Sequence, residues 1–295
     1  MIFRYLKYVS GRRDERGLVA IGLGDWCEPR DLGVPISSPL ALTDSVTVYD
    51  MAKKSALIFD VIGETERRDY ALELAEDIRR AVREHLIDKK TMLAAGNCQT
   101  SEAIIISHGI VDEGEEEALA YAELLRITHE RGDLAFCGMI GLRFIFDVLA
   151  SHGDIDLALR MITSEEEPSY GSMIKRGATA LCEATMENGI NESENHHFFG
   201  DIIRLFHNYV AGLRVNPYMR DPNECLFSPV IPTGIDHAEG VYRFPTGEAK
   251  FGWRRDGDAV CAYISLPGGA FGEFCHGNMR RELTAGDAEF IIKNV

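Results

Sequence analysis

The chain lacks any long hydrophobic run. None of the apolar stretches in its 295 residues approaches the roughly 20 residues that a membrane-spanning helix requires. The N-terminal stretch carries Arg4 and Lys7 among its apolar residues, which argues against a secretory signal peptide. We therefore expect no membrane partner and a cytoplasmic location, unless a region that precedes residue 1 carries a signal.

Positive charge is also scarce. Lys and Arg number 31 against 47 Asp and Glu, so the net charge is −16 at neutral pH. Nucleic acids and anionic membrane surfaces bind to basic patches, and this balance argues against both as partners. Acidity alone otherwise indicates only a soluble protein.

Paired cysteines are missing too. The seven cysteines are scattered, odd in number and never spaced as C-x-x-C, which argues against a disulfide framework or a zinc site and favours a reducing compartment. Residues 268–272 are rich in glycine, but no Lys-Ser/Thr pair follows them, which argues against a phosphate-binding loop. We expect neither a metal nor a cofactor.

What the sequence does contain is a succession of amphipathic helices between residues 43 and 212. Thr43 is a candidate N-cap of the first helix, and Gly63 is a candidate stop. The further helices that we expect cover residues 70–86, 101 onward, 115–131, 138–151, 154–163, 178–187 and 196–212. Toroids, simple bundles and solenoids all satisfy this pattern, although the missing repeat period argues mildly against a solenoid.

The C-terminal part of the chain has a different pattern. Prolines at five positions between 217 and 245 interrupt helices, and short runs at 240–244, 249–253 and 259–266 predict strands. Asp256-Gly257-Asp258 between the last two runs predicts a hairpin turn. We expect a small domain of antiparallel strands.

The strongest candidate for chemistry is Glu183, the one carboxylate in the small and apolar segment 177–183. Burial among apolar residues raises the pKa of a carboxyl group, as general acid or base catalysis at neutral pH requires. Asn195 and His196 follow closely and could hold a polar substrate. The alternatives are a solvated Glu183, a helix cap at Asn195 and a surface imidazole at His196. Adjacent helical residues point about 100° apart, so His196 and His197 are not expected to share a metal.

A series of short motifs extends this picture. They lie in order at residues 22–26, 97–101, 136–141, 153–158, 168–171, 177–183 and 193–200. From about Gly17 onward, this ordered set resembles the catalytic and C-terminal regions of the α-L-rhamnosidases of glycoside hydrolase family 78. The resemblance implies a mainly α fold: an (α/α)6 toroid over residues 1–214, incomplete at its N-terminus. A small antiparallel β-sandwich over residues 215–295 would follow it.

The resemblance also implies an activity, the inverting hydrolysis of terminal α-L-rhamnosides with Glu183 as general base. Asn195 and His196 match the family's sugar-binding Asn-His pair, and a neutral rhamnoside suits the acidic chain. Asp25 and Trp26 offer a carboxylate beside an aromatic ring that could grip the sugar; the alternative is a buried Trp with a turn-forming Asp. Cys182 departs from the family, in which an aromatic residue usually precedes the general base.

The general acid is harder to find in this sequence. Residues 13–16, Arg-Asp-Glu-Arg, imitate the family's acid motif but lack its flanking Cys-Pro and Trp, so we interpret them as a charged loop. We expect the first helices and the acid to lie in a missing N-terminal region or a companion chain, which would leave apolar helix faces exposed. The alternatives are a non-catalytic remnant that binds carbohydrate or a partner, and a related enzyme such as a uronyl hydrolase.

Overall fold

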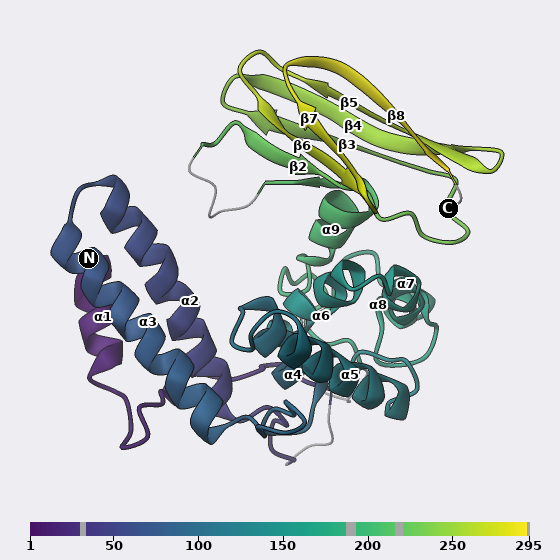
Figure 1. Cartoon of the computed structure of the whole chain (residues 1–295). Helices are drawn as coiled ribbons and strands as arrows, with labels where there is room; N and C mark the ends of the chain where they lie inside the picture. The colour runs from purple at the N-terminus through teal and green to yellow at the C-terminus, as the bar shows by residue number, and fades with distance from the viewer. Residues whose placement is uncertain (30–33, 187–192, 216–220, 294–295) are drawn as a thin grey trace. The chain divides into compact units, whose positions relative to one another are not determined.

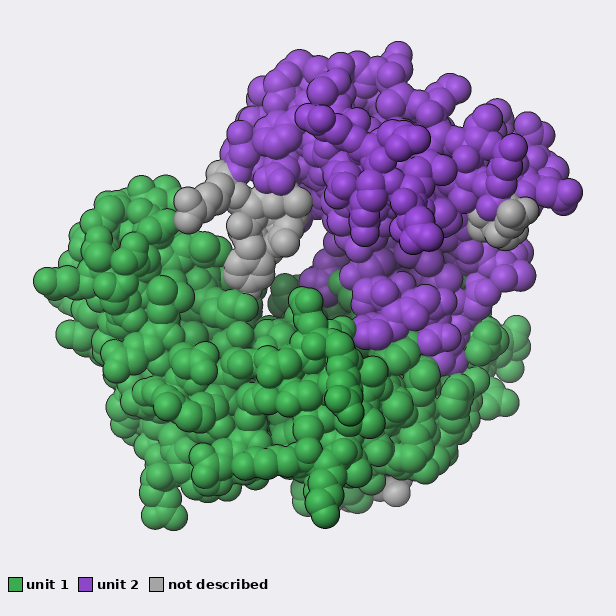
Figure 2. Space-filling model, in the orientation of Figure 1, with its two compact units in different colours: residues 1–148, 159–200 green, residues 149–158, 201–295 purple. Residues whose placement is uncertain are grey.

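The computed structural model describes residues 1–29, 34–186, 193–215 and 221–293. It divides into two compact units, shown in Figure 2. The first comprises Met1–Val148 and Leu159–Gly200, and the second comprises Leu149–Ala158 and Asp201–Val295. The units change after Gly200, before the boundary near residue 214 that the sequence predicts. The second unit also includes the short helical segment Leu149–Ala158.

Helices dominate the first two thirds of the chain (Figure 1). They are α1 (Ile2–Ser10), α2 (Leu40–Val61), α3 (Thr65–His85), α4 (Gln99–Ser107), α5 (Glu115–Glu130), α6 (Met139–Ser151), α7 (Ile155–Thr163), α8 (Tyr170–Lys175), α9 (Ile202–Leu205) and the π-helical turn η1 (Phe206–Val210). In the described part of the chain, none is long and apolar enough to cross a membrane.

The hairpin of α2 and α3 follows directly from the sequence. Gly63 adopts a positive φ of 75°, and Glu64 N–H donates to the Phe59 carbonyl at 2.8 Å, which ends α2 where the glycine predicts. The two helices pack side by side through an apolar stripe that includes Ile78 and Val82 (Figure 1). The predicted cap was wrong: α2 begins at Leu40 after Pro39, which is the N-cap, and Thr43 is buried inside the helix.

The predictions for the middle helices are confirmed. Helices α5, α6 and α7 begin and end within two residues of the expected ranges, and α4 begins within two residues of the expected start. Gly132, with a φ of 71°, follows α5 as the stop that the sequence indicates. Helices α4 and α5 pack against each other, as α2 and α3 do.

Two predicted helices are corrected by the structure. Residues 178–186 contain no helix, and residue 187 lies outside the described residues. The expected helix at 196–212 is reduced to α9 and η1. The physical reason is long-range backbone pairing: Glu183 N–H donates to the Ser193 carbonyl at 2.8 Å, and His196 N–H donates to the Leu181 carbonyl at 2.7 Å. A backbone N–H used across a loop is not available for a helical bond.

The early helices carry several exposed apolar and aromatic side chains. Leu6 and Val9 of α1 are buried, while its other face is open to solvent. The exposed apolar and aromatic side chains here are Ile2, Tyr5 and Tyr8 of α1, Ile58 and Val61 of α2, Ile62 just beyond it, and Leu72 of α3.

The second unit contains two four-stranded sheets. The strands are β1 (Leu213–Arg214), β2 (Glu224–Phe227), β3 (His237–Phe244), β4 (Gly247–Asp256), β5 (Ala259–Leu266), β6 (Phe271–His276), β7 (Met279–Leu283) and β8 (Gly286–Lys293). One sheet has the order β1-β2-β6-β7 and the other β3-β4-β5-β8. The predicted hairpin between β4 and β5 is confirmed, with Gly257 at a φ of 60°.

Aromatic side chains pack between these two sheets. The ring of Phe227 on β2 lies 6.3 Å from that of Phe251 on β4, and the ring of Phe274 on β6 stacks 3.8 Å from that of Phe290 on β8. One detail differs from the expected antiparallel pattern: β2 and β6 pair in parallel. The pairing joins strands far apart in sequence, so no turn signal announces it.

Candidate active site

The structure brings Glu183 and His196 together. Glu183 Oε2 lies 3.4 Å from His196 Nδ1, and both side chains are half-buried, with 26% and 19% of their surface exposed. The pair thus combines a carboxylate and an imidazole in a setting that is reachable from solvent yet partly shielded from it. This arrangement can accept or donate a proton and can bind a hydroxyl group.

Backbone hydrogen bonds between residues 181–183 and residues 193–196 hold the pair in place. Glu183 N–H donates to the Ser193 carbonyl at 2.8 Å, and Ser193 N–H donates back to Glu183 Oε2 at 3.1 Å. His196 N–H donates to the Leu181 carbonyl at 2.7 Å, and its ring lies 3.8 Å from that of Phe198. Backbone bonds on both sides therefore fix the separation of the carboxylate and the imidazole.

The ring nitrogen of His196 that faces Glu183 has no well-aligned hydrogen bond in the described part of the chain. This nitrogen, Nδ1, is buried and has no aligned hydrogen-bond partner among the described residues, although the Glu183 carboxylate is near. Asn195, the other predicted member of this cluster, is exposed, and its own N–H donates to Ser193 Oγ at 3.4 Å. A buried nitrogen without an aligned bond is costly unless a ligand or water completes it.

Asp25 has a different environment from the one that the sequence suggests. It is fully buried, and its Oδ1 accepts the N–H groups of Ile140 at 2.8 Å and Gly141 at 2.9 Å. Its Oδ2 accepts the Gly138 N–H at 2.8 Å and the Thr100 hydroxyl. Desolvation raises the pKa of the Asp25 carboxyl, against the opposing effect of these four donors. Asp25 therefore caps the start of α6 through the backbone N–H groups there, and it joins that helix to α4 through Thr100.

The same contacts position Trp26. Its carbonyl accepts the Met139 N–H at 2.8 Å, while its side chain is 43% exposed. Only glycine fits at position 138, where a Cβ atom would lie 2.3 Å from the carbonyl oxygens of both Asp25 and Trp26. The predicted pair therefore separates into a buried positioning carboxylate and an exposed aromatic ring.

The acid-like segment at residues 13–16 is a loop, as the sequence predicts. Asp14 accepts the Leu18 N–H at 3.0 Å and two hydrogen bonds from the Arg16 guanidinium, at 2.7 and 3.0 Å. The backbone bond from Leu18 and the Arg16 guanidinium lower the pKa of Asp14. A general acid needs a raised pKa, so this carboxyl group is tuned in the opposite direction.

Sequence reasoning missed Glu102, the most perturbed carboxyl group with a stated pKa. It lies on α4 with 0% exposure, and desolvation raises its pKa to about 8. Its Oε1 accepts the Ala94 N–H at 2.7 Å, while its Oε2 is buried without a partner in the described residues. A Glu in a helix gives no signal of such burial unless its neighbours' packing is known.

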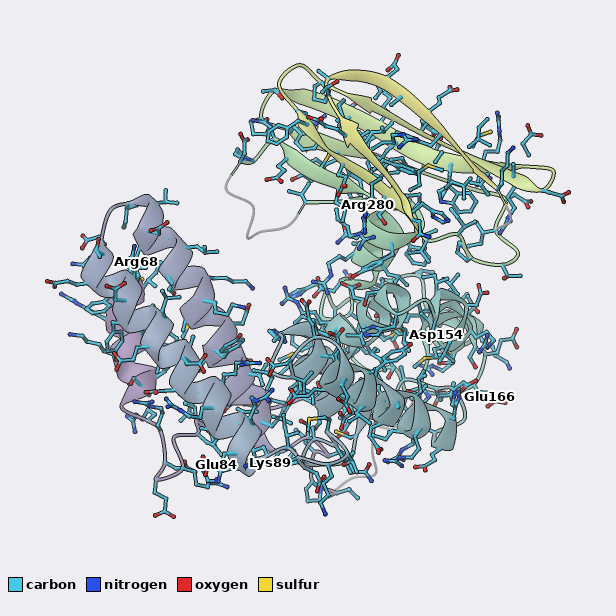
Figure 3. The ribbon with its side chains drawn as sticks, in the orientation of Figure 1. Arg68, Glu84, Lys89, Asp154, Glu166 and Arg280 are labelled. Carbon is cyan, nitrogen blue, oxygen red and sulfur yellow. The ribbon has the colours of Figure 1, made fainter. Side chains whose placement is uncertain are left out.

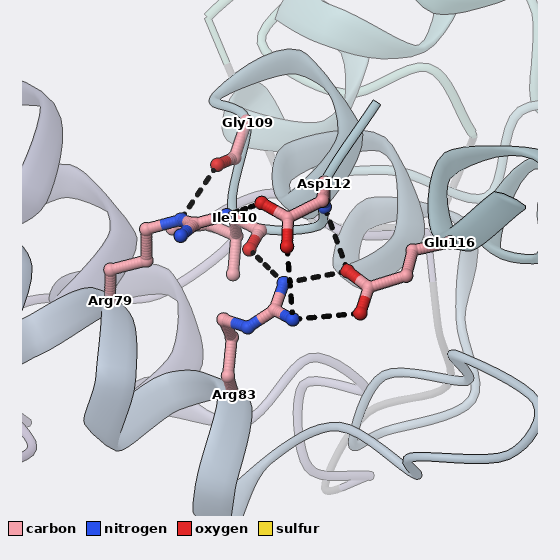
Figure 4. A network of polar contacts seen from close by, with 6 residues as sticks. All are labelled: Arg79, Arg83, Gly109, Ile110, Asp112 and Glu116. Atoms are coloured by element: carbon pink, nitrogen blue, oxygen red, sulfur yellow. Dashed lines mark hydrogen bonds and ion pairs between the residues drawn. The ribbon is translucent and has the colours of Figure 1, made fainter. Parts of the chain in front are cut away.

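The first unit also holds a charged cavity of about 410 Å³, between α3 and the start of α5. Arg79 donates to the Gly109 carbonyl at 3.0 Å and to Asp112 at 2.6 Å (Figure 4). Arg83 binds both carboxylate oxygens of Glu116, at 2.7 and 2.8 Å. These guanidinium groups are saturated by protein acceptors, which gives the cavity wall a structural role.

Four further charged side chains line this cavity. They are Glu76, Arg80 and Glu84 on α3 and Lys89 in the loop that follows; Figure 3 labels Glu84 and Lys89. Across the described ranges, no cluster of three or more His, Cys, Asp or Glu side chains could hold a metal ion.

Known proteins with similar sequences are α-L-rhamnosidases. Residues 1–210 match the family model described as bacterial alpha-L-rhamnosidase 6 hairpin glycosidase domain. An alpha-L-rhamnosidase from Formosa agariphila is 22% identical over 271 residues, which are 86% of this chain and 28% of that protein. The chain thus spans well under half the length of this relative.

Solved structures show the same fold. The α-L-rhamnosidase from Dictyoglumus thermophilum has a TM-score of 0.87 at 22% identity, over 99% of this chain and 36% of that one. The Streptomyces avermitilis enzyme, solved in complex with L-rhamnose, has a TM-score of 0.82 at 19% identity, over 99% and 29%. Because the family model covers most of its residues, this chain belongs to the bacterial α-L-rhamnosidase six-hairpin glycosidase family.

Proposed function

We propose that Glu183 is the general base of an inverting glycoside hydrolase that acts on terminal α-L-rhamnosides. The observation that carries this proposal is the 3.4 Å contact between Glu183 Oε2 and His196 Nδ1. It places a proton acceptor directly beside an imidazole, so that both groups could reach the same sugar unit. Membership of the rhamnosidase family supports the choice of substrate.

In this reaction Glu183 accepts a proton from a water molecule while the oxygen of that water attacks the anomeric carbon. A second carboxyl group, roughly 6.5–9.5 Å away, protonates the leaving oxygen. The free hydrogen-bonding capacity of His196 Nδ1 suits a sugar hydroxyl or the attacking water. Asn195 is exposed and retains a side-chain amide for vicinal hydroxyl groups.

Trp26 and Asp25 have separate roles in this proposal. The exposed Trp26 ring offers a flat apolar surface to one face of the sugar. Asp25 is a positioning residue: it fixes the loop that carries Trp26 and does not itself contact substrate. The finer architecture is also part of the proposal. The α2–α3 and α4–α5 pairs support a partial (α/α)6 toroid, and the aromatic layer between the sheets supports a β-sandwich.

Hydrolysis of 4-nitrophenyl α-L-rhamnoside by the chain tests the catalytic assignment. Glu183→Gln keeps the shape of the side chain but removes the proton acceptor, and we expect the rate to fall by roughly 10²–10⁴. The matched control is Glu194→Gln, which changes an exposed carboxylate of the same loop and should keep full turnover. NMR should show β-L-rhamnose as the first product. Undiminished turnover in Glu183→Gln, or α-L-rhamnose first, would refute the assignment.

A second candidate is saccharide binding without turnover, which the lowered pKa of Asp14 favours because it removes the nearest match to a general acid. In that case the chain binds L-rhamnose at Glu183 and His196 but hydrolyses no rhamnoside. The neighbouring Cys182 is a half-buried free thiol that reports occupancy. L-Rhamnose should slow the alkylation of Cys182 whether the chain hydrolyses rhamnosides or only binds them. Only the turnover assay distinguishes these two functions.

A further inference from the structure

One face of the β3-β4-β5-β8 sheet gathers polar side chains around a tyrosine. Glu239, Gly252, Tyr263 and Glu289 are direct neighbours across the four strands, so their side chains point to the same face. The adjacent row on this face contains His237, Arg254 and Cys261. All of these residues except Gly252 line a cavity of about 330 Å³ within the second unit.

The Tyr263 ring lies across the sheet, because its cross-strand neighbour on β4 is Gly252. The Tyr263 hydroxyl oxygen is 3.0 Å from the place where a Cβ atom of Gly252 would be. A tyrosine that stood upright from β5 could not bring its hydroxyl over the next strand, which is only about 5 Å away. The missing side chain of Gly252 therefore lets the ring lean towards β3.

Glu239 on β3 is the direct neighbour of Gly252, the residue over which the Tyr263 hydroxyl lies. Burial and this carboxylate raise the pKa of Tyr263, so the phenol stays neutral. Tyr263 is half-buried and lines the cavity, whereas Glu239 is exposed. The result is an aromatic plate on one face of the sheet.

The groups around the plate offer both donors and acceptors. Glu239 and Glu289 supply carboxylate oxygens from opposite sides, and Arg254 and His237 supply guanidinium and imidazole nitrogens. The carboxylates disfavour an anionic ligand and the guanidinium disfavours a cationic one. A neutral polyol with one apolar ring face fits this set, since its hydroxyl groups donate and accept in turn.

We propose that this face of the second unit binds a neutral saccharide, with Tyr263 stacked on the sugar ring. The choice of a saccharide among neutral polyols rests on the proposed function. The sheet site nevertheless has no residue in common with the candidate active site that contains Glu183 and His196. It needs no catalytic turnover. Its role is to hold a sugar unit independently of the hydrolytic step.

Two free cysteines allow both sites to be followed in one experiment. Cys261 lines the sheet cavity and Cys182 adjoins Glu183, and both thiols are half-buried. The chain is treated with iodoacetamide in the presence of L-rhamnose or a rhamnose-containing disaccharide, and alkylation is followed at each cysteine by mass spectrometry. We expect alkylation of Cys261 to slow at least about threefold at saturation. Saturation-transfer NMR of the sugar provides a second readout.

Substitutions then assign the effect. Tyr263→Ala should abolish the protection of Cys261 and weaken binding about tenfold or more, as expected for loss of a buried aromatic face. Tyr263→Phe keeps the plate and should retain protection. Val241→Ala, on the same sheet face but outside the cavity, is the matched control. Protection that persists in Tyr263→Ala would overturn the proposal.

The same experiment separates this inference from the proposed function. Protection of Cys261 without protection of Cys182 supports the sheet site and contradicts the Glu183 site, and the reverse result does the opposite. D-Glucuronate and D-glucosamine test the charge argument. Protection of Cys261 by either charged sugar but not by a neutral one overturns the proposal, as does the absence of any saccharide signal at Cys261 and in the NMR readout.

Discussion

Glu102→Gln tests the buried carboxyl group of α4. The substitution keeps the size of the side chain and the oxygen that accepts the Ala94 N–H at 2.7 Å, but it removes the ionisable proton. In the wild type, burial raises the pKa of Glu102 to about 8, from an ordinary 4.5. The folded chain therefore holds a proton at neutral pH that the unfolded chain releases.

The sign and size of the effect follow from proton linkage. Below pH 4.5 the carboxyl is neutral in both states, and its contribution to stability is fully present. As the pH rises towards about 8, only the unfolded state ionises, and the free energy of unfolding falls by about 1.4 kcal/mol per pH unit. Between pH 5 and 7.5 this amounts to about 3 kcal/mol. The free energy of unfolding of Glu102→Gln should not show this fall, because the amide does not ionise.

Urea unfolding at a series of pH values measures the difference. We expect the wild type to lose stability relative to Glu102→Gln by about 3 kcal/mol between pH 5 and 7.5, with the two curves closest at low pH. Glu84→Gln, which changes an exposed carboxyl group of α3, is the control and should follow the wild type. Parallel curves for wild type and Glu102→Gln would show that the buried carboxyl ionises freely and that the reasoning is wrong.

Two further substitutions test the contacts that hold the first unit together. Asp25→Asn would turn an amide NH2 towards the N–H donors at the start of α6. We expect the free energy of unfolding, measured by heat or urea, to fall by about 2–4 kcal/mol. An unchanged unfolding midpoint would contradict the capping role. Arg83→Gln removes the bidentate contact with Glu116 and should cost about 1–2 kcal/mol, an effect that shrinks with added salt. Arg80→Gln, at an exposed pair, should cost less than about 0.5 kcal/mol, and equal losses in both variants would contradict the argument.

The sequence predicted those parts of the fold that local pattern determines. The stripe of α3 and the glycine stops after α2 and α5 depend on neighbours three or four residues apart, so periodicity was sufficient. The segment at 178–186 was mistaken for a helix because its backbone partners lie beyond residue 190, where no local signal points. The parallel pairing of β2 with β6 escaped prediction for the same reason.

The candidate site divides in a similar way. The motif order placed Glu183 and His196 in one sequence neighbourhood, and the structure adds their contact. Adjacency in sequence did not reveal that Asp25 turns inward while Trp26 turns outward, because that depends on donors from α4 and α6. The burial of Glu102 was equally invisible, since α4 is buried at every position from Gln99 to Ile106 and has no polar face that would mark it.

If Trp26 contacts the sugar as proposed, the way it is held has a consequence for how ligand preference could change. Its loop is anchored by the Asp25 carboxylate and by the Trp26 carbonyl, neither of which depends on the indole ring. The identity of the side chain at this position is thus uncoupled from the position of the backbone that presents it. Evolution or a designer can exchange the ring for another group and sample new specificities at little cost in stability, as long as Asp25 and Gly138 stay in place.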